Sequence, residues 1–412
     1  MNKARRAFQG GLLALTLTGV FLLGTNAEAW CPFGGFEAIY TYYREGNLIC
    51  SLGISNFYAL GAVILAVLLL RRAFCGYMCP VGTISEWLGA ASRRFGLRTF
   101  RVPAKLDRVL SLGKYVVLAA ILAATWQLGE LAFRGYCPAY ALLSRHGADI
   151  TLWAYVVAGA TAAGSLLITM PFCRWLCPLA AVMNPLSRFG LGRIKRDAAA
   201  CSSCGRCTAS CPMAIPVDRL QQMTASRCLA CMECVAACPG KESRTLSWGP
   251  PNWLGRAWPQ AAVIAILLVC GGSAVAFAYF APLPSFVRSR GVQPDHIASI
   301  ELRIHGLTCR GRANFLVRFL ERDDISQITG EELEGQGYYK LEAWPEPNGA
   351  LVRIAFDPRM VDQDGIRRAI TEPYYEKAAN RWWISPFQIE GYSPRSLEWR
   401  PRKPVGDGGR SR

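Results

Sequence analysis

Long uncharged apolar runs, separated by short polar and basic segments, dominate the first 282 residues of the chain. Two of the runs, Ile150 to Phe172 and Ala257 to Pro282, have the length of a membrane-spanning helix, which needs roughly 17–25 mostly apolar residues. Two shorter runs, Asn56 to Leu70 and Tyr115 to Leu128, reach that length only with flanking residues or local thinning of the bilayer. The pattern predicts an α-helical membrane protein, because a soluble protein would need an unusually large core to bury so many apolar helices.

The first apolar run, Gly11 to Gly24, has two interpretations. It follows Lys3, Arg5 and Arg6 and precedes an Ala-Glu-Ala sequence at 27–29. These features are typical of a secretory signal peptide over residues 1–29, and equally of a short first transmembrane helix. With the first run included, we expect about four to five transmembrane helices, and both interpretations place Trp30 outside the cytoplasm.

Composition and charge agree with a membrane location. Hydrophobic residues make up 52% of the chain and charged residues only 18%, below the usual share of about 25%. The net charge of +17 comes largely from basic residues beside the apolar runs, so we do not expect nucleic-acid binding. Between the second and third runs lie Arg71, Arg72, Arg93, Arg94, Arg98, Arg101, Lys105 and Arg108. Because basic loops stay inside, this loop and the loop 171–256 should be cytoplasmic, and the C-terminal part should be periplasmic.

The membrane part carries an internal repeat. FCGYMCP at 74–80 corresponds to FCRWLCP at 172–178, with cysteines 98 residues apart in both cases (173 − 75 and 177 − 79). WCPFG at 30–34 corresponds to YCPAY at 136–140. Residues 30–190 are therefore predicted to be a duplicated transmembrane domain, and repeats of this kind often place a site at their interface. The four inner cysteines are Cys75, Cys79, Cys173 and Cys177.

The cytoplasmic loop contains the strongest motif, C-x2-C-x2-C-x3-C-P, twice. CSSCGRCTASCP spans 201–212 and CLACMECVAACP spans 228–239. In bacterial ferredoxins three cysteines of such a run hold one 4Fe-4S cluster and the fourth reaches the other cluster. Disulfides are disfavoured in the cytoplasm, and a zinc site uses four ligands, not two matched quartets. Residues 191–250 are thus predicted to hold two 4Fe-4S clusters. The first takes Cys201, Cys204, Cys207 and Cys238, and the second takes Cys228, Cys231, Cys234 and Cys211.

With these motifs, residues 30–250 resemble the NapH and NosR type of membrane polyferredoxins. That group includes the quinol-dehydrogenase component of periplasmic nitrate reduction, the methylamine-utilisation ferredoxin-type proteins and the cytochrome oxidase accessory proteins linked to copper. The resemblance implies an integral electron carrier of the bacterial inner membrane.

The inner cysteines allow three interpretations. If each pair lies on one helix, positions i and i+4 share a face, and Pro80 and Pro178 end those helices or turn the chain. The four thiolates then hold a third cluster or a soft ion such as Cu(I). Alternatively the two pairs are redox-active dithiols, or the cysteines are buried packing residues. Recurrence of both cysteines at one offset argues against packing alone.

Several cofactors are not expected. None of the three histidines lies in an apolar run, and no C-x-x-C-H occurs, so we expect no haem. No P-loop occurs, and no G-x-G-x-x-G follows a strand, so we do not expect the protein to use a nucleotide. A quinol is the natural diffusible carrier for such a membrane protein, which suggests a component of a quinol dehydrogenase.

The C-terminal part, 296–395, changes to an α+β pattern. Strands are predicted at 298–309, 337–344, 350–358 and 382–392, with helices at 310–324 and 361–377, in the βαββαβ order of the ferredoxin-like fold. HGLTCRGR at 305–312 and FDPRMVDQDGIRRAI at 356–370 resemble the heavy-metal-associated domain. Arg312 replaces the second cysteine of that family's loop, which leaves Cys309 as a weak candidate ligand. Residues 396–412 are predicted to be disordered.

We therefore predict an inner-membrane protein that relays electrons between the quinone pool, its cytoplasmic clusters and a periplasmic or membrane redox partner. The alternatives are a copper maturation factor or cupric reductase for an oxidase, favoured by the outer domain, and a structural adaptor whose clusters only sense redox state.

The predicted topology can be tested with reporter fusions. Alkaline phosphatase fused at Gln336 should be active, and a fluorescent reporter fused at Gly240 should fluoresce, because basic residues crowd the loops assigned to the inside. High phosphatase activity at Gly240 would contradict the orientation.

Overall fold

The computed structural model divides the chain into two compact units, Met1–Pro282 and Leu283–Arg412, which are described separately. It describes residues 3–23, 30–45, 55–96, 100, 102–128, 132–144, 151–240, 245–251, 257–281, 284–289, 296–307, 310–322, 338–346, 349–359, 361–376 and 380–393. Cys309 and the predicted disordered tail lie outside these residues.

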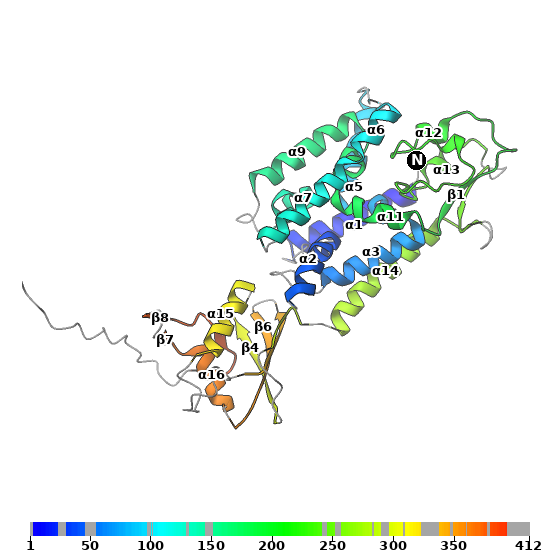
Figure 1. Ribbon diagram of the computed structural model, residues 1–412. Helices are drawn as coiled ribbons and strands as arrows, with labels where there is room; N and C mark the ends of the chain where they lie inside the picture. The colour runs from blue at the N-terminus through cyan, green and yellow to red at the C-terminus, as the bar shows by residue number, and fades with distance from the viewer. Residues whose placement is uncertain are drawn as a thin grey trace, which may run out of the picture. The chain divides into compact units, whose positions relative to one another are not determined.

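The first unit is built from apolar helices that lie side by side, with a small insert at one end (Figure 1). The longer helices are α1 (Lys3–Phe21), α2 (Pro32–Glu45), α3 (Ser55–Leu70), α5 (Pro80–Arg94), α7 (Gly113–Leu128), α9 (Leu152–Leu167) and α14 (Ala261–Phe280). Shorter helices connect them: α4 (Ala73–Tyr77), α6 (Ala104–Leu110), η2 (Ala132–Tyr136), α8 (Pro138–Leu143), α10 (Pro171–Trp175) and α11 (Pro178–Ser187).

Two helical segments of this unit, Ala104–Gln127 and Ala261–Phe280, are long and apolar enough to cross a membrane. Their large apolar side chains point outward: Val116 is 69% exposed and Val269 is 71% exposed. An outward apolar surface is expected of helices in lipid and not of the core helices of a soluble protein.

The apolar helices α3 and α9 are shorter. Each has 16 residues and is therefore about 24 Å long, less than the ~30 Å of a hydrocarbon core. Helix α9 covers only part of the predicted run 150–172, because Met170 adopts a left-handed conformation and Pro171 starts α10. The total number of spans and their orientation stay predictions.

Each inner cysteine pair is divided between two helices, so the expectation that both cysteines share one helical face is wrong. Cys75 lies within α4, whereas Cys79 has extended backbone angles and is the N-cap of α5. Cys173 and Cys177 repeat this arrangement in α10 and at the start of α11. The prolines do not end these helices. Each takes the first helical position of the next helix, where a missing N–H costs nothing.

The insert is attached firmly to the membrane helices. Strands β1 (Arg193–Arg196) and β2 (Leu246–Gly249) pair in antiparallel fashion, and between them lie α12 (Arg206–Ala209), η4 (Val217–Arg219) and α13 (Glu233–Ala236). The amides of Leu191 and Gly192 donate to the carbonyls of Leu68 and Leu69, at 2.9 and 2.8 Å. These bonds satisfy carbonyls at the end of α3 that have no partner within the helix.

The second unit contains a five-stranded antiparallel sheet in the order β3-β5-β6-β4-β9. Its elements are β3 (Phe286–Ser289), β4 (Ala298–His305), α15 (Arg310–Leu320), β5 (Lys340–Glu346), β6 (Gly349–Phe356), α16 (Gln363–Thr371), β7 (Tyr374–Glu376), β8 (Arg381–Trp383) and β9 (Gln388–Ile389). Alternate strand residues such as Ile300 and Val352 pack against Leu316 of α15 and Ile370 of α16.

This unit differs from the sequence expectation at three points. Strand β3 pairs with β5 and lies before the predicted start at residue 296. Helix α16 ends at Thr371, before Pro373, so that Tyr374–Glu376 forms β7 instead of the end of a helix. The predicted last strand is divided between β8, which pairs with β7, and β9, which pairs with β4.

Helix α16 has a defined N-cap whose contribution can be measured. The Asp362 side chain accepts a hydrogen bond from the amide of Gly365 at 2.7 Å. Replacing Asp362 by Ala should lower the free energy of unfolding of this unit by about 1 kcal/mol. Asp362→Asn should keep most of that contribution, because Asn is also a good N-cap residue. Hydrogen exchange of α16 amides in the intact protein reports the change, and equal protection in both variants would contradict the cap.

Candidate metal centres

The cysteines of the insert surround two cavities, grouped as the spacing of the motifs predicts. One cavity is lined by Cys201, Cys204, Cys207 and Cys238. The other is lined by Cys211, Cys228, Cys231 and Cys234. In each case three cysteines come from one run and the fourth comes from the other. Four converging thiols are the donor set that a 4Fe-4S cluster requires, so the residues fit two such clusters.

The two cysteine runs have matching backbone conformations. Ser203 and Ala230, at equivalent positions, have φ of 53° and 48°, and Gly205 and Met232, two residues later, have φ of 69° and 59°. Left-handed residues of this kind are strained unless they are glycine. The conformation turns backbone amides toward sulfur: the amide of Ser203 donates to Cys201 and that of Ala230 donates to Cys228. N–H donors favour a thiolate, which is the ligand form.

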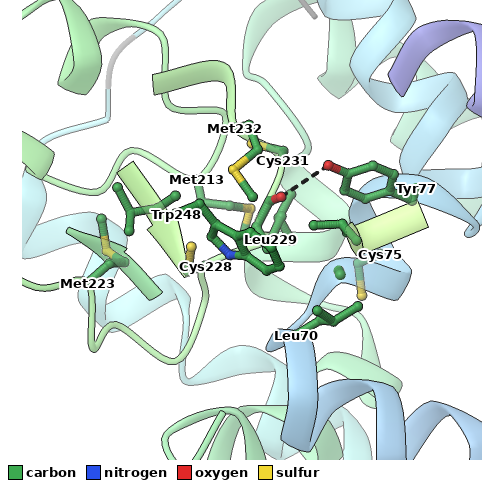
Figure 2. Close-up of a cluster of buried hydrophobic side chains, with 14 of the residues drawn as sticks. Leu70, Cys75, Tyr77, Met213, Met223, Cys228, Leu229, Cys231, Met232 and Trp248 are labelled. Carbon is green, nitrogen blue, oxygen red and sulfur yellow. Dashed lines mark hydrogen bonds between the residues drawn. The ribbon is translucent and has the colours of Figure 1, made fainter. Parts of the chain in front are cut away.

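The two cavities differ in their exposure. The first contains the exposed Cys204, whose pKa is lowered by the amide of Arg206 and the hydroxyl of Ser202. In the second, Cys228 and Cys231 are buried, and burial raises their pKa values to about 11 and about 12. Figure 2 shows that the surrounding side chains are apolar, among them Met213, Met223, Met232 and Trp248.

Three fully buried arginines lie beside the second cavity: Arg5, Arg71 and Arg72. Arg5 interacts electrostatically with Cys231, and Arg71 interacts with Cys228. The Arg71 side chain also donates to the carbonyls of Gly192 and Ala225, at 2.9 and 3.2 Å. A guanidinium is always charged and is buried only where anions or several acceptors compensate it.

Arg72 is also a neighbour that three of the four inner cysteines share. Its Nη2 lies 3.8 Å from Cys75 Sγ and 3.3 Å from the carbonyl oxygen of Cys173. It interacts electrostatically with the thiols of Cys75, Cys173 and Cys177. Cys79 in turn interacts with Cys75 and Cys177, so the repeat brings all four cysteines to one region.

The groups around the buried positive charge of Arg72 bear on whether these cysteines are thiols or thiolates. Besides Cys75 and the Cys173 carbonyl, its side chain contacts the neutral Asn184 Oδ1 at 3.2 Å, and no carboxylate in the described part of the chain pairs with it. An isolated buried charge costs far more than a folded domain can tolerate. The Cys173 carbonyl and Asn184 accept hydrogen bonds from Arg72 as neutral groups, and the thiols of Cys75, Cys173 and Cys177 are the neighbours that can become anions.

The spacing of the thiols distinguishes between types of centre. Across the described residues, no three His, Cys, Asp or Glu side chains approach closely enough to hold one metal ion. A single ion brings thiolates within about 4 Å of one another, since its bonds to sulfur are about 2.3 Å long. A cluster spreads its thiolates over separate irons. The thiols of the described residues are thus spaced more widely than a site with three or four thiolates on one ion requires.

Sequence analysis assigned Arg71 and Arg72 only a role in topology and did not single out Met170. With the offset of 98, Met170 occupies the position of Arg72 in the second repeat (170 − 72). Both side chains are fully buried. The two repeats thus differ in charge at this position, as they do at Arg71 and Thr169 and at Gly76 and Arg174, and these differences are visible in the aligned sequences of the two halves.

The candidate Cys309 lies outside the described residues, so its role stays a prediction. Arg312, which stands where the heavy-metal-associated loop has its second cysteine, donates to the carbonyl of Gly306 at 2.7 Å. This bond ties the arginine to its own loop. No contact of the described residues favours copper binding in this unit.

Comparison with known proteins identifies iron–sulfur domains over the same residues. A model of 4Fe-4S binding domains matches residues 52–98 and 150–197, whose starts lie 98 residues apart (150 − 52), and a 4Fe-4S dicluster domain matches residues 193–239. These matches identify 4Fe-4S binding domains in both halves of the repeat and in the insert. No solved structure matches the chain.

Among curated proteins, the putative electron transport protein YccM of Escherichia coli is 32% identical over 205 residues, 48% of this chain and 56% of that protein. The regulatory protein NosR of Pseudomonas aeruginosa is 29% identical over 143 residues, 34% of this chain and 20% of NosR. The ferredoxin-type protein NapH of Haemophilus influenzae is 27% identical over 225 residues, 51% of this chain and 76% of NapH. The iron–sulfur part of the chain is therefore similar to polyferredoxins of the NapH and NosR type. The chain covers little more than half of YccM, so the activity and partners of the whole protein are proposals.

The different exposure of the two cavities predicts their order of iron loss. The insert should hold about eight irons, and a chelator should remove roughly half of them in a fast phase, because Cys204 is exposed whereas Cys228 and Cys231 are buried. Cys204→Ala should remove the fast phase, and Cys270→Ala, which changes a buried cysteine outside every motif, should not. A single release phase, or zinc without acid-labile sulfide, would contradict the assignment.

Proposed function

We propose that the protein is a membrane-bound iron–sulfur electron carrier that relays electrons between the quinone pool and a periplasmic or membrane redox partner. Two 4Fe-4S clusters in a cytoplasmic insert and a third thiolate-bound centre at Cys75, Cys79, Cys173 and Cys177 would carry the electrons. The electron-transport and ferredoxin-type relatives support the general function. The observation that carries the third centre is the buried Arg72, which interacts electrostatically with the thiols of Cys75, Cys173 and Cys177.

The contacts of Arg72 support a route from the insert to the membrane core. Its backbone amide donates to the carbonyl of Cys228 at 3.2 Å, and its guanidinium lies 3.8 Å from Cys75 Sγ. One residue therefore contacts a candidate ligand of the second cluster and a candidate ligand of the third centre. The exposed first cluster would exchange electrons at the surface of the insert, and the buried second cluster would pass them to or from the membrane core.

The third centre can be tested by single and combined substitutions. Each of Cys75→Ala, Cys79→Ala, Cys173→Ala and Cys177→Ala should lower electron transfer about as much as the quadruple variant, because residues that act as a unit are not additive. The assay follows electrons from a quinol analogue to an artificial acceptor, with the iron of the insert measured in each variant and Cys270→Ala as the control.

The alternatives give different patterns. If the cysteines form two separate dithiols, the loss of electron-transfer rate should be the same within each pair, Cys75 with Cys79 and Cys173 with Cys177. Wild-type rates in both Cys79→Ala and Cys177→Ala would overturn the functional role of these motifs. Arg72→Met, which copies Met170 into the first repeat, should reduce the iron bound in the membrane part while leaving the first cluster of the insert in place.

A further inference from the structure

Helix α1 contains the sequence that resembles a signal peptide, yet two of its polar residues, Arg5 and Gln9, are buried. Arg5 and Gln9 are 0% and 1% exposed, whereas Leu15 and Phe21 are 67% and 52% exposed. In a soluble protein this distribution would be reversed. Polar groups directed inward and apolar groups directed outward are expected of a helix that stays in the membrane beside other helices.

The buried end of α1 contacts α4 and α5. The Arg5 guanidinium forms a salt bridge with Glu86 of α5, and its Nη1 donates to the carbonyl of Gly76 at 3.3 Å. Gln9 donates to the same carbonyl at 2.9 Å and to Glu86 Oε2 at 3.2 Å. Trp87 Nε1 donates to Gln9 Oε1 at 3.4 Å.

Arg5 also reaches the second cysteine run. Its Nη2 lies 3.5 Å from Glu233 Oε1, and Glu233 stands between Cys231 and Cys234. Next to it, Tyr77 donates to the carbonyl of Ala230 at 3.2 Å, as Figure 2 shows, and the Arg5 guanidinium lies 5.8 Å from the Tyr77 ring. The side chain therefore links α1, α5 and the loop that is assigned to the second cluster.

We propose that α1 remains part of the folded protein and that Arg5 is a positioning residue for the second cluster. Arg5 holds Glu233 and its loop against α5, and its buried charge raises the reduction potential of the cluster, since a nearby cation stabilises the more negative reduced form. This proposal rests on the proposed function in one respect, namely that the loop binds a cluster.

The retention of α1 is tested by the mass and N-terminal sequence of the protein purified from membranes. The expected chain still contains Arg5. A mature chain that begins after Ala29 would overturn the proposal whatever the clusters do.

The role of Arg5 is tested by redox titration of the cluster signals in the electron paramagnetic resonance spectrum. Arg5→Gln should shift one signal to lower potential by a tenfold change in the reduction equilibrium, about 59 mV for a one-electron couple, and leave the other cluster unchanged. Arg5→Lys should restore most of the potential. Lys3 is an exposed cation two residues before Arg5, so Lys3→Gln is the matched control and should cause no shift.

Arg5→Gln leaves Glu86 buried without its cation, and the variant is therefore prone to misfold. The double variant Arg5→Gln and Glu86→Gln removes both charges and keeps hydrogen-bonding side chains of similar size. If the double variant and Glu86→Gln alone both hold their full iron content and have the same potentials, Arg5 has no influence on the cluster. Iron and acid-labile sulfide in the wild type report separately on the proposed function, so their absence would not be mistaken for a failure of Arg5.

Discussion

The arrangement of the first unit depends on a buried positive charge that must be compensated. Arg72 lies between the last turn of α3 and the cysteine loop of the insert, and its neighbours are thiols, carbonyls and an amide. Breaking a buried ion pair costs about 3–5 kcal/mol, a large share of the stability of a typical protein. The cysteines that meet around Arg72 are therefore structural partners of the arginine as well as candidate ligands.

The same residue explains how a duplicated sequence produces a site that is not symmetric. Both repeats contribute a helix-starting Cys-Pro pair with nearly equal backbone angles, −67° and 119° at Cys79 and −64° and 117° at Cys177. Each repeat contributes two cysteine sulfurs, so the two halves together bring four sulfurs to the site. At this position only the first repeat has a cation, because Met170 takes the place of Arg72 in the second, and the Arg72 guanidinium contacts Cys75 Sγ and the carbonyl of Cys173.

Much of the insert could be predicted from the sequence, because the x2 and x3 spacings permit few ways of surrounding a cluster. The cysteine grouping around the two cavities follows directly from that spacing. The helical geometry of the inner pairs could not be predicted in this way. A periodic pattern cannot show that Met78 ends one helix and Pro80 starts another, since the break depends on local backbone angles. The burial of Arg5, Arg71 and Arg72 was also missed, because a basic residue beside an apolar run normally lies in water.

With the proposed third centre in place, the buried charge at Arg72 would connect the lifetime of the protein to the supply of iron. The thiols that face it come from both halves, so the first half cannot complete the site before Cys173 and Cys177 have been synthesised. A chain that receives no metal keeps neutral thiols around a guanidinium, and its membrane half loses the compensation described above. Such a chain would open locally more often and become a substrate for membrane proteases, since degradation follows the population of open states. When iron is scarce, the cell would then be left with fewer copies of the protein instead of a pool of inactive ones.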